Sequence, residues 1–240
     1  MKNLLEKFAL FLLDIVDSFY QNIIFDNRYK FIIEGLFNTI IIALFAVIIG
    51  IIIGIIIAII RNYHEQTGKL KIGNAIAKIY VSIIRGTPVI LQLMIIYYVI
   101  FKSVNINIIL VGVIAFGINS GAYVSEIIRA GINSIPISQS EAGYSLGLKY
   151  RQVMRYIIMP QAIKNILPAL GNEFITLLKE TSVGAYIGII ELTKASDIIA
   201  SRTYEYFFPL IIIALIYLFM TLGLSKLVSY MERRLNNVRG

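Results

Sequence analysis

Apolar residues in this chain gather into five long segments separated by polar ones. The longest uncharged segment, Leu36–Ile60, has 25 residues, enough to cross a hydrocarbon core of about 30 Å with some tilt. The others are expected at Pro88–Phe101, with its start extended by Ile79–Ile84, and at Ile106–Ile128, Pro168–Ile190 and Phe207–Tyr230. The pattern predicts an all-α integral membrane protein with five transmembrane helices. Polar connections are expected at 62–78, 103–107 and 192–206.

Small residues recur at every fourth position of the first span. Gly50, Gly54 and Ala58 lie on one helical face. Such a face lets two helix backbones approach closely within a membrane. We predict that it packs against another span and has no direct functional role.

The segment before the first span is amphipathic. Polar side chains recur there at roughly helical spacing, at Asn3, Lys7, Asp14, Ser18 and Gln21. We expect residues 3–22 to form a helix lying along the membrane interface. A sixth span is the alternative, and it would place Asp14 and Asp17 in hydrocarbon. The chain thus divides into an N-terminal interfacial segment (1–34), a transmembrane domain (35–231) with a long loop at 132–167, and a basic tail (232–240).

The distribution of lysine and arginine predicts the orientation. With the N-terminus outside, fourteen of these residues lie on the cytoplasmic side and seven outside, with Lys179 inside a span. The opposite orientation inverts this bias, so the N-terminus is predicted outside and the C-terminus inside. The fourteen are Arg61, Lys69, Lys71, Lys78, Arg85, Arg129, Lys149, Arg151, Arg155, Lys164, Lys226, Arg233, Arg234 and Arg239. The loop at 132–167 is therefore predicted to be cytoplasmic.

Composition narrows the chemistry. The chain is 58% hydrophobic and 15% charged, it has no cysteine, and His64 is its one histidine. The net charge of +8 comes from basic residues that are confined to particular loops, a distribution typical of membrane topology. Nucleic acid is therefore not expected as a partner. We expect no metal site and no catalytic residues, because the sequence has neither a phosphate-binding Gly-rich loop nor a histidine-rich cluster. Energy for any transport must come from a partner or an ion gradient.

The cytoplasmic loop has the pattern of two short helices. Ser138 and Glu141 have capping-box spacing, and Gly147 is a natural left-handed terminator. Lys149–Ile158 then predicts a second helix, with Arg151 and Arg155 on its polar side and an end at Met159-Pro160. The pair is either a rigid knob for a cytosolic partner or an ordinary interhelical loop.

The same loop resembles the EAA loop of ABC importer permeases. That pattern is Glu-Ala-Ala, three residues, Gly, nine residues and Ile-x-Leu-Pro, and it matches Glu141-Ala142-Gly143, Gly147 and Ile157-Ile158-Met159-Pro160 in spacing. The departures are Gly143 for the second alanine and Met159 for the leucine. The resemblance implies a type I ABC importer permease-like fold, with a coupling helix that fits a groove on the ATP-binding subunit. The residues implied in coupling are Glu141, Ala142, Gly143, Gly147, Arg151 and Pro160.

Further motifs resemble permeases of the polar amino acid family (histidine, glutamine, arginine and opine importers). They include Arg85-Gly86-Thr87-Pro88 with Gln92, Ser120-Gly121-Ala122-Tyr123, Glu126–Gly131 and Lys179–Ser182. The resemblance covers about residues 35–230. It implies a bacterial inner-membrane location, a second permease subunit, a cytosolic ABC ATPase subunit and an extracytoplasmic amino-acid-binding protein. ATP and Mg²⁺ are then used by the ATPase, and this chain binds no cofactor.

The fourth predicted span carries a polar stripe within an arc of about 120°. Each bare charge at mid-membrane costs roughly 2.5–3.5 kcal/mol, so the stripe must face protein or water. The third span has a weaker stripe, and the two are predicted to line one pathway for a substrate with amino and carboxylate groups. The candidates are Asn172, Glu173, Thr176, Lys179 and Glu180, with Asn119, Tyr123 and Gln92. Asn172 and Glu173 are the preferred contacts, and the stripe's net negative charge weakly favours basic amino acids (arginine, lysine or histidine). In the alternative, Lys179 pairs with a glutamate and only holds the bundle together.

Residues with a structural or gating role are expected at the entrance of the second span. They are Arg85, Gly86, Thr87 and Pro88, with Glu126 of the third span. Arg85 either anchors the helix start at the headgroups or contributes to a gate. Two other functions stay open: a secondary amino acid transporter driven by an ion gradient, and a membrane scaffold without transport.

Overall fold

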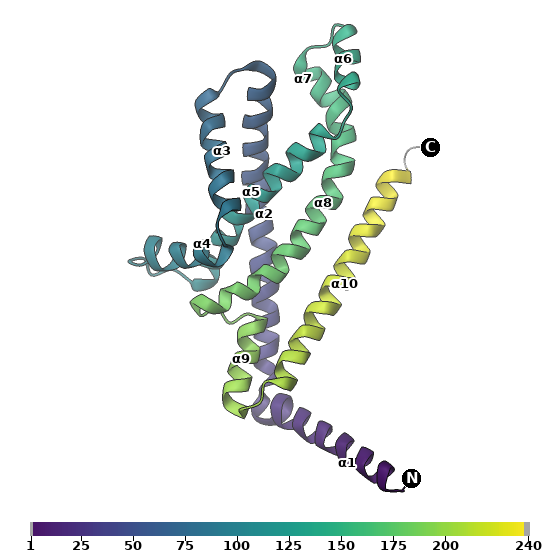
Figure 1. Cartoon of the computed structure of the whole chain (residues 1–240). Coiled ribbons are helices and arrows are strands. Elements are labelled where there is room, and N and C mark those ends of the chain that lie inside the picture. Colours follow the sequence, from purple (N-terminus) through teal and green to yellow (C-terminus); the bar gives the residue numbers. More distant parts are fainter. Residues whose placement is uncertain (1, 238–240) are drawn as a thin grey trace.

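The computed structural model describes residues 2–237 and is built from helices, with no strand among those residues (Figure 1). The longer helices are α1 (Lys2–Phe19), α2 (Tyr29–Thr67), α3 (Lys71–Gly86), α5 (Ile108–Asn133), α8 (Met159–Glu180), α9 (Leu192–Thr203) and α10 (Phe207–Asn237). Short ones are α4 (Val89–Ile95), α6 (Ile137–Ser145) and α7 (Tyr150–Val153). Single turns of π or 3₁₀ helix cover Tyr20–Ile24, Phe25–Asn27, Ile96–Ile100, Met154–Ile158 and Thr181–Ile187. The predicted all-α fold is confirmed.

Helices α2 and α5 form the central pair, and the small-residue face of α2 lies between them. A Cβ atom at Gly50 would lie 2.8 Å from the Ser120 Cβ atom, and Gly54 is as close to Val124 and Ser125. Gly50, Gly54 and Ala58 are all buried. The predicted packing role of this face is confirmed, since only glycine lets the two backbones come so near.

The second predicted span is a broken helix. Helices α3 and α4 meet at an angle of 109°, and the break falls at Thr87 and Pro88, which both have extended backbone. The polar connection expected at 62–78 is wrong in extent, because α2 continues to Thr67 and α3 begins at Lys71. Gly68, with φ of 68°, ends α2 in the left-handed conformation. Polar residues such as arginine, lysine and glutamate are good helix formers, so a polar composition does not by itself end a helix.

Three helices, α2, α5 and α10, are long and apolar enough to cross a membrane, and the bent pair of α3 and α4 adds a fourth. Helix α8 is not among them, and the count of five spans stays a prediction. The expected span from Pro168 to Ile190 is also wrong in its bounds. Pro168 lies inside α8, which ends at Glu180 and is followed by the 3₁₀ turn.

The loop predicted to be cytoplasmic forms the expected pair of short helices, α6 and α7, at one end of the bundle (Figure 1). Gly147 has φ of 78° after the end of α6, which confirms it as the terminator. The capping box is wrong: Ser138 lies inside α6, which follows Pro136 without a side-chain cap. The second helix does not end at Pro160. It passes through the π turn into α8, and the change in hydrogen-bond pattern at this turn, directly before Pro160, lets the helix continue past the proline.

The opposite end of the bundle carries α9, where only a connection was expected. Glu191, fully buried, accepts hydrogen bonds of 2.7 Å from the backbone amides of both Thr193 and Lys194 and so caps this helix. The Tyr217 hydroxyl of α10 donates to the same carboxylate at 3.2 Å. Because glutamate is an uncommon cap, the sequence pattern did not reveal α9.

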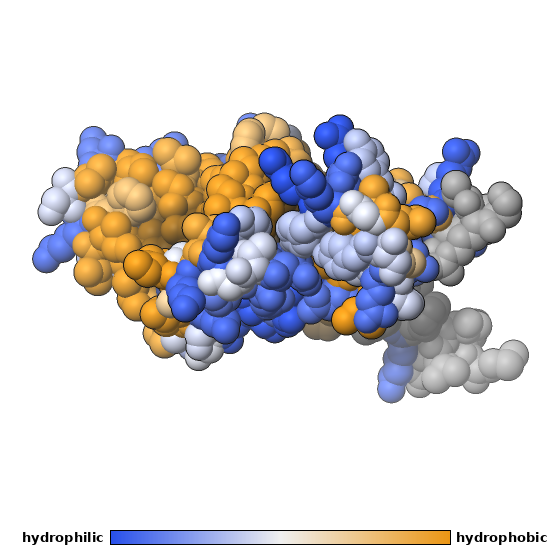
Figure 2. Space-filling model, turned by 90° about the horizontal axis from the view of Figure 1, so that it is seen from above, coloured by the Kyte–Doolittle hydropathy of each residue, from blue (hydrophilic) through white to orange (hydrophobic). Residues whose placement is uncertain are grey.

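The two ends of the chain match the predicted segments only in part. Helix α1 extends away from the bundle at the α9 end (Figure 1). This agrees with a helix over residues 3–22, and its position along the membrane interface stays a prediction. The basic tail assigned to 232–240 is helical as far as Asn237, and Arg239 lies outside the described residues. Seen from the α6 and α7 end, hydrophilic residues gather over the middle of the molecule and apolar ones over one side (Figure 2).

Candidate functional site

A polar pocket of about 530 Å³ lies between α5, α8 and the end of α3. Its walls include four residues predicted for the pathway, namely Tyr123, Asn172, Glu173 and Thr176. Arg85 and Glu126, predicted as structural or gating residues, line it too, with Ile127, Ala130 and Ala169. The two polar stripes therefore meet in one pocket, as expected from their faces.

Glu173 is the acidic group of this pocket on α8. Its side chain is half-buried, and its Oε1 atom accepts a hydrogen bond of 2.8 Å from the hydroxyl of Ser120 on α5. Ser120 is fully buried, and we did not single it out from the sequence as a site residue. This bond orients the carboxylate and leaves it as an acceptor that lines the pocket.

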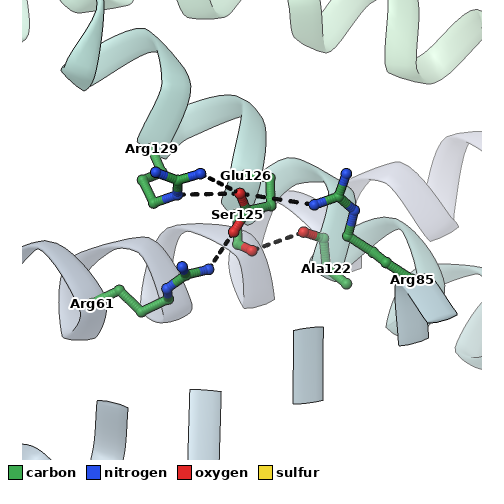
Figure 3. A network of polar contacts seen from close by, with 6 residues as sticks. All are labelled: Arg61, Arg85, Ala122, Ser125, Glu126 and Arg129. Carbon is green, nitrogen blue, oxygen red and sulfur yellow. Dashed lines mark hydrogen bonds and ion pairs between the residues drawn. The ribbon is translucent and has the colours of Figure 1, made fainter. Parts of the chain in front are cut away.

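Three arginines surround the other acidic group, Glu126 of α5, one from the same helix and two from α2 and α3 (Figure 3). Arg61 of α2 donates to one carboxylate oxygen, Arg129 of α5 donates to the other at 2.7 Å, and the Arg85 guanidinium lies at 3.8 Å. The Arg61 side chain is 12% exposed and that of Arg85 is 45% exposed. The cluster has a formal charge of +2, and Arg85 is its most accessible cation.

Arg85 is also placed against the pocket wall. Its guanidinium lies 5.4 Å from the ring centroid of Tyr123, within cation–π distance. Helix α3 ends at Gly86, where the second predicted span bends, and Arg85 therefore lies at the end of α3 beside this bend. The pocket is thus lined by a cationic side chain, Arg85, and an anionic one, Glu173.

Gln92 and Asn119 are not in this pocket. The Gln92 side-chain amide donates to the carbonyl oxygen of Ile84 at 2.7 Å and to the Thr87 hydroxyl at 2.8 Å, across the break. Asn119 then donates to the Gln92 amide oxygen at 2.9 Å. Both side chains are buried. They tie α4 and α5 to the bend, which is a structural role.

Lys179 and Glu180 complete the predicted stripe but are absent from the pocket walls. Lys179 is exposed, and no ion pair joins it to a glutamate among the described residues. The alternative in which Lys179 holds the bundle together through such a pair is therefore not what the structure shows.

The residues expected to couple to an ATPase gather around α6. Glu141 and Ala142 are exposed on this helix, Arg151 is exposed on α7, and Pro160 is exposed at the start of α8. Gly143 is buried, and a Cβ there would lie 2.8 Å from Ile157 and 2.9 Å from Val153. The glycine at this position thus allows α6 to pack tightly on the following helix.

The knob is also fastened to α2. The Tyr150 hydroxyl of α7 donates to the side-chain oxygen of Asn62. Burial raises the pKa of Tyr150 above its ordinary value, so the phenol stays a donor at neutral pH. This hydrogen bond joins α7 to α2, the span that packs on α5.

Residues 2–237 contain no group of three or more histidine, cysteine, aspartate or glutamate side chains arranged to hold a metal ion.

The sequence from residue 50 to residue 237 matches the family described as the binding-protein-dependent transport system inner membrane component. The chain belongs to this family. The permease is 39% identical over 213 residues to the putative glutamine transport system permease protein GlnP of Rickettsia bellii (strain RML369-C), covering 88% of this chain and 95% of that protein. It is 43% identical over 164 residues to the arginine transport system permease protein ArtQ of Bacillus subtilis (strain 168), covering 68% and 75% of the two chains.

Solved structures agree with the fold. The permease resembles a chain in the crystal structure of an amino acid ABC transporter with histidines, with a TM-score of 0.80, 47% identity and coverage of 86% and 94% of the two chains. A chain of the MetNI methionine ABC transporter matches with a TM-score of 0.74 and 16% identity, covering 88% and 98%, which supports the fold alone. The type I ABC importer permease-like fold expected from the sequence is confirmed.

Proposed function

We propose that the permease is the membrane-spanning subunit of an ATP-driven importer for polar amino acids. Its family and the transport roles in the names of its relatives support this assignment. The pocket between α5 and α8 is the proposed substrate site within the translocation pathway.

The main support for the proposal is that an acidic residue, Glu173, and a basic residue, Arg85, line the same pocket. A polar amino acid has both an ammonium and a carboxylate, and each needs a partner of opposite charge once it leaves water. Glu173 is suited to an amino group and Arg85 to a carboxylate, with Asn172 and Thr176 as neutral hydrogen-bonding groups on the same α8 wall.

A weak preference for basic amino acids is a finer part of the proposal. It rests on Glu173 as an acidic acceptor of a substrate's positive side chain or amino group. We expect Glu173→Gln to reduce uptake of arginine, lysine and histidine more than uptake of glutamine, because the amide keeps the hydrogen bond and loses the charge.

The matched variant is Glu180→Gln, seven residues along the same helix and outside the pocket walls. Uptake is measured with radiolabelled amino acids in proteoliposomes containing the full importer. If Glu173→Gln leaves uptake of every basic amino acid unchanged, the preference is excluded. If Glu180→Gln weakens uptake equally, the pocket is not the specific site.

Coupling is proposed to act through α6. Two permease subunits, identical or homologous, form the pathway, and two cytosolic ATPases engage the exposed Glu141 and Ala142 with α6 and α7. An external binding protein delivers substrate, and ATP with Mg²⁺ is used by the ATPases. The N-terminus lies outside and the C-terminus in the cytoplasm. Closure of the ATPases draws the two α6 helices together and switches access between the membrane faces.

The same reconstitution tests the importer against its alternatives. An importer takes up substrate only with the ATPase and ATP, whereas a secondary transporter works with an ion gradient and no ATPase. A scaffold takes up nothing under either condition. The double variant Glu141→Ala, Ala142→Arg is expected to lose both ATPase attachment and uptake. Intact attachment and uptake in that variant would contradict the proposed coupling.

A further inference from the structure

A second hollow in the molecule is larger and differs in chemistry from the substrate pocket. It has a volume of about 1190 Å³ and lies between α2, the end of α5, the knob helices and the first half of α8. Aliphatic residues and methionines form most of its walls, including Ile51, Ile55, Ile163, Ile166 and Leu170. The proposed transport cycle does not use the apolar walls of this groove, and of the residues proposed for coupling only Arg151 lies at its rim.

The groove lies on the other side of α8 from the substrate pocket. Its α8 residues are Ile163, Ile166, Leu167 and Leu170, whereas the pocket takes Ala169, Asn172, Glu173 and Thr176. At 100° per residue the centres of these two sets are about 120° apart. The α2 residues Ile55 and Ile59, which also line the groove, are 43% and 62% exposed. The groove therefore opens away from the pathway, on an apolar surface that suits lipid.

The polarity of the groove's walls changes along α2. The walls run along α2 from Ile51 to Asn62, a rise of about 16 Å, close to one leaflet of a core of about 30 Å. At the Asn62 end the apolar walls give way to Tyr150, Arg151 and Arg155. An apolar slot as deep as one leaflet, closed by basic groups at its end, has the outline of a phospholipid.

The charges at this end are uncompensated. Arg151 and Arg155 are four residues apart, both are exposed, and neither has an ion-pair partner among the described residues. The Tyr150 hydroxyl is already bound to Asn62, so the two guanidinium groups are the charged donors at the rim. The Arg155 guanidinium lies 5.7 Å from the ring of Tyr156, a residue of the same rim. Guanidinium groups bind phosphate oxygens in a two-pronged geometry.

We propose that this groove binds one anionic phospholipid, with acyl chains along α2 and α8 and its phosphate on Arg151 and Arg155. Basic pockets between transmembrane helices are a known way to hold acidic headgroups. The assignment to the cytoplasmic leaflet rests on the proposed orientation, whereas the binding itself does not. Because residues of the knob, α2 and α8 all line the groove, the lipid would contact both the coupling helices and the spans.

Native mass spectrometry of the full importer tests the charge requirement. The complex is titrated with phosphatidylglycerol or phosphatidylcholine of identical acyl chains. We expect stronger retention of phosphatidylglycerol, and a loss of about fivefold for Arg155→Gln, which lies at the rim and outside the proposed coupling residues. The matched control is Lys226→Gln, which removes an exposed positive charge from α10. Equal retention of the two lipids, or an equal effect of Lys226→Gln, would overturn the site and leave only general attraction to the membrane.

A fluorescence measurement places the lipid. The chain has no tryptophan, so Ile59→Trp in the groove gives the purified permease a single one. Brominated phosphatidylglycerol in vesicles is expected to quench it at a lower mole fraction than brominated phosphatidylcholine does, and Arg155→Gln should remove that difference. The control is Phe219→Trp on α10, which is 71% exposed and should show no headgroup preference. The same preference at both positions would contradict a specific site. Neither measurement includes amino acid uptake. A negative result would therefore contradict the lipid site without contradicting the proposed transport function.

Discussion

Helices α5 and α10 are both long and apolar enough to cross a membrane, yet they hold opposite places in the fold. In the most apolar stretch of each, 67% of residues are buried in α5 and 11% in α10, although α10 is the more apolar helix. In water the more apolar helix would be inside. In a bilayer the surroundings are themselves apolar, so close packing and polar contacts decide which helix is central. Hydrophobicity therefore identifies a span without indicating its neighbours.

The two helices differ in the side chains that make this possible. Helix α5 presents buried small residues, among them Gly117, Ser120 and Gly121, to α2. Helix α10 presents large side chains outward, with Phe219 71% exposed and Leu222 49% exposed. The central helix is thus built for contact with protein, and the outer one for contact with lipid.

The largest effect is expected from one substitution made at both kinds of surface. Gly54→Leu would push a side chain into Val124 of α5 and should cost about 3 kcal/mol or more, with loss of folded protein. Gly223→Leu on α10 meets no atom within 4 Å and should be neutral. Detergent-solubilised yield and thermal unfolding measure both. Equal tolerance would mean that α2 and α5 are not the tightly packed pair.

The next effect concerns the ion cluster of α5. Glu126→Gln leaves the mostly buried Arg61 without its carboxylate and should cost roughly 2–3 kcal/mol, less than in a fully buried pair because Arg129 and Arg85 stay partly in water. Adding Arg61→Met should restore much of the loss. The control, Glu232→Gln, removes an exposed carboxylate from α10. An unfolding temperature unchanged in Glu126→Gln would show that the cluster contributes nothing to stability.

Glu191, which accepts from Tyr217 of α10, should confer a pH dependence on stability. Burial raises the pKa of this carboxyl above its ordinary value, so the folded protein holds the proton more tightly than the unfolded chain. The stabilisation is fully present below the unfolded pKa of about 4.3 and is lost as pH rises through the folded pKa. Glu191→Gln should reduce the fall of the unfolding temperature as the pH rises above about 4. Glu34→Gln, at an exposed site of α2, should keep the wild-type slope.

The smallest effects come from one conservative exchange on each helix. Phe116→Leu in α5 removes a fully buried ring and should cost roughly 1–2 kcal/mol. Phe219→Leu in α10 should stay within about 0.5 kcal/mol, because lipid fills the space. Urea or thermal unfolding of the two variants gives the comparison directly. A reversed order would contradict the assignment of α10 to the lipid-facing side.

Much of the fold could be predicted because its signals are local. The uncharged stretch Leu36–Ile60, the Gly50 and Gly54 face and the terminator Gly147 each depend on a short window of sequence, and the structure confirms them. The sharp bend at Thr87 and Pro88 was not predicted from the sequence. Its angle depends on Gln92 and Asn119, which bond across it from other parts of the chain.

The sequence by itself determined that this is a helical membrane protein of the importer permease family with a short helical knob. Only the tertiary structure decided which polar groups meet: Ser120 with Glu173, 53 residues apart, and Arg61 with Glu126, 65 residues apart. The physical reason is that insertion into lipid requires continuous apolar segments of sufficient length, and these can be recognised in the sequence. The pairing of buried polar groups depends instead on how the helices pack, and hydrophobic patterns do not encode that once the surroundings are apolar too.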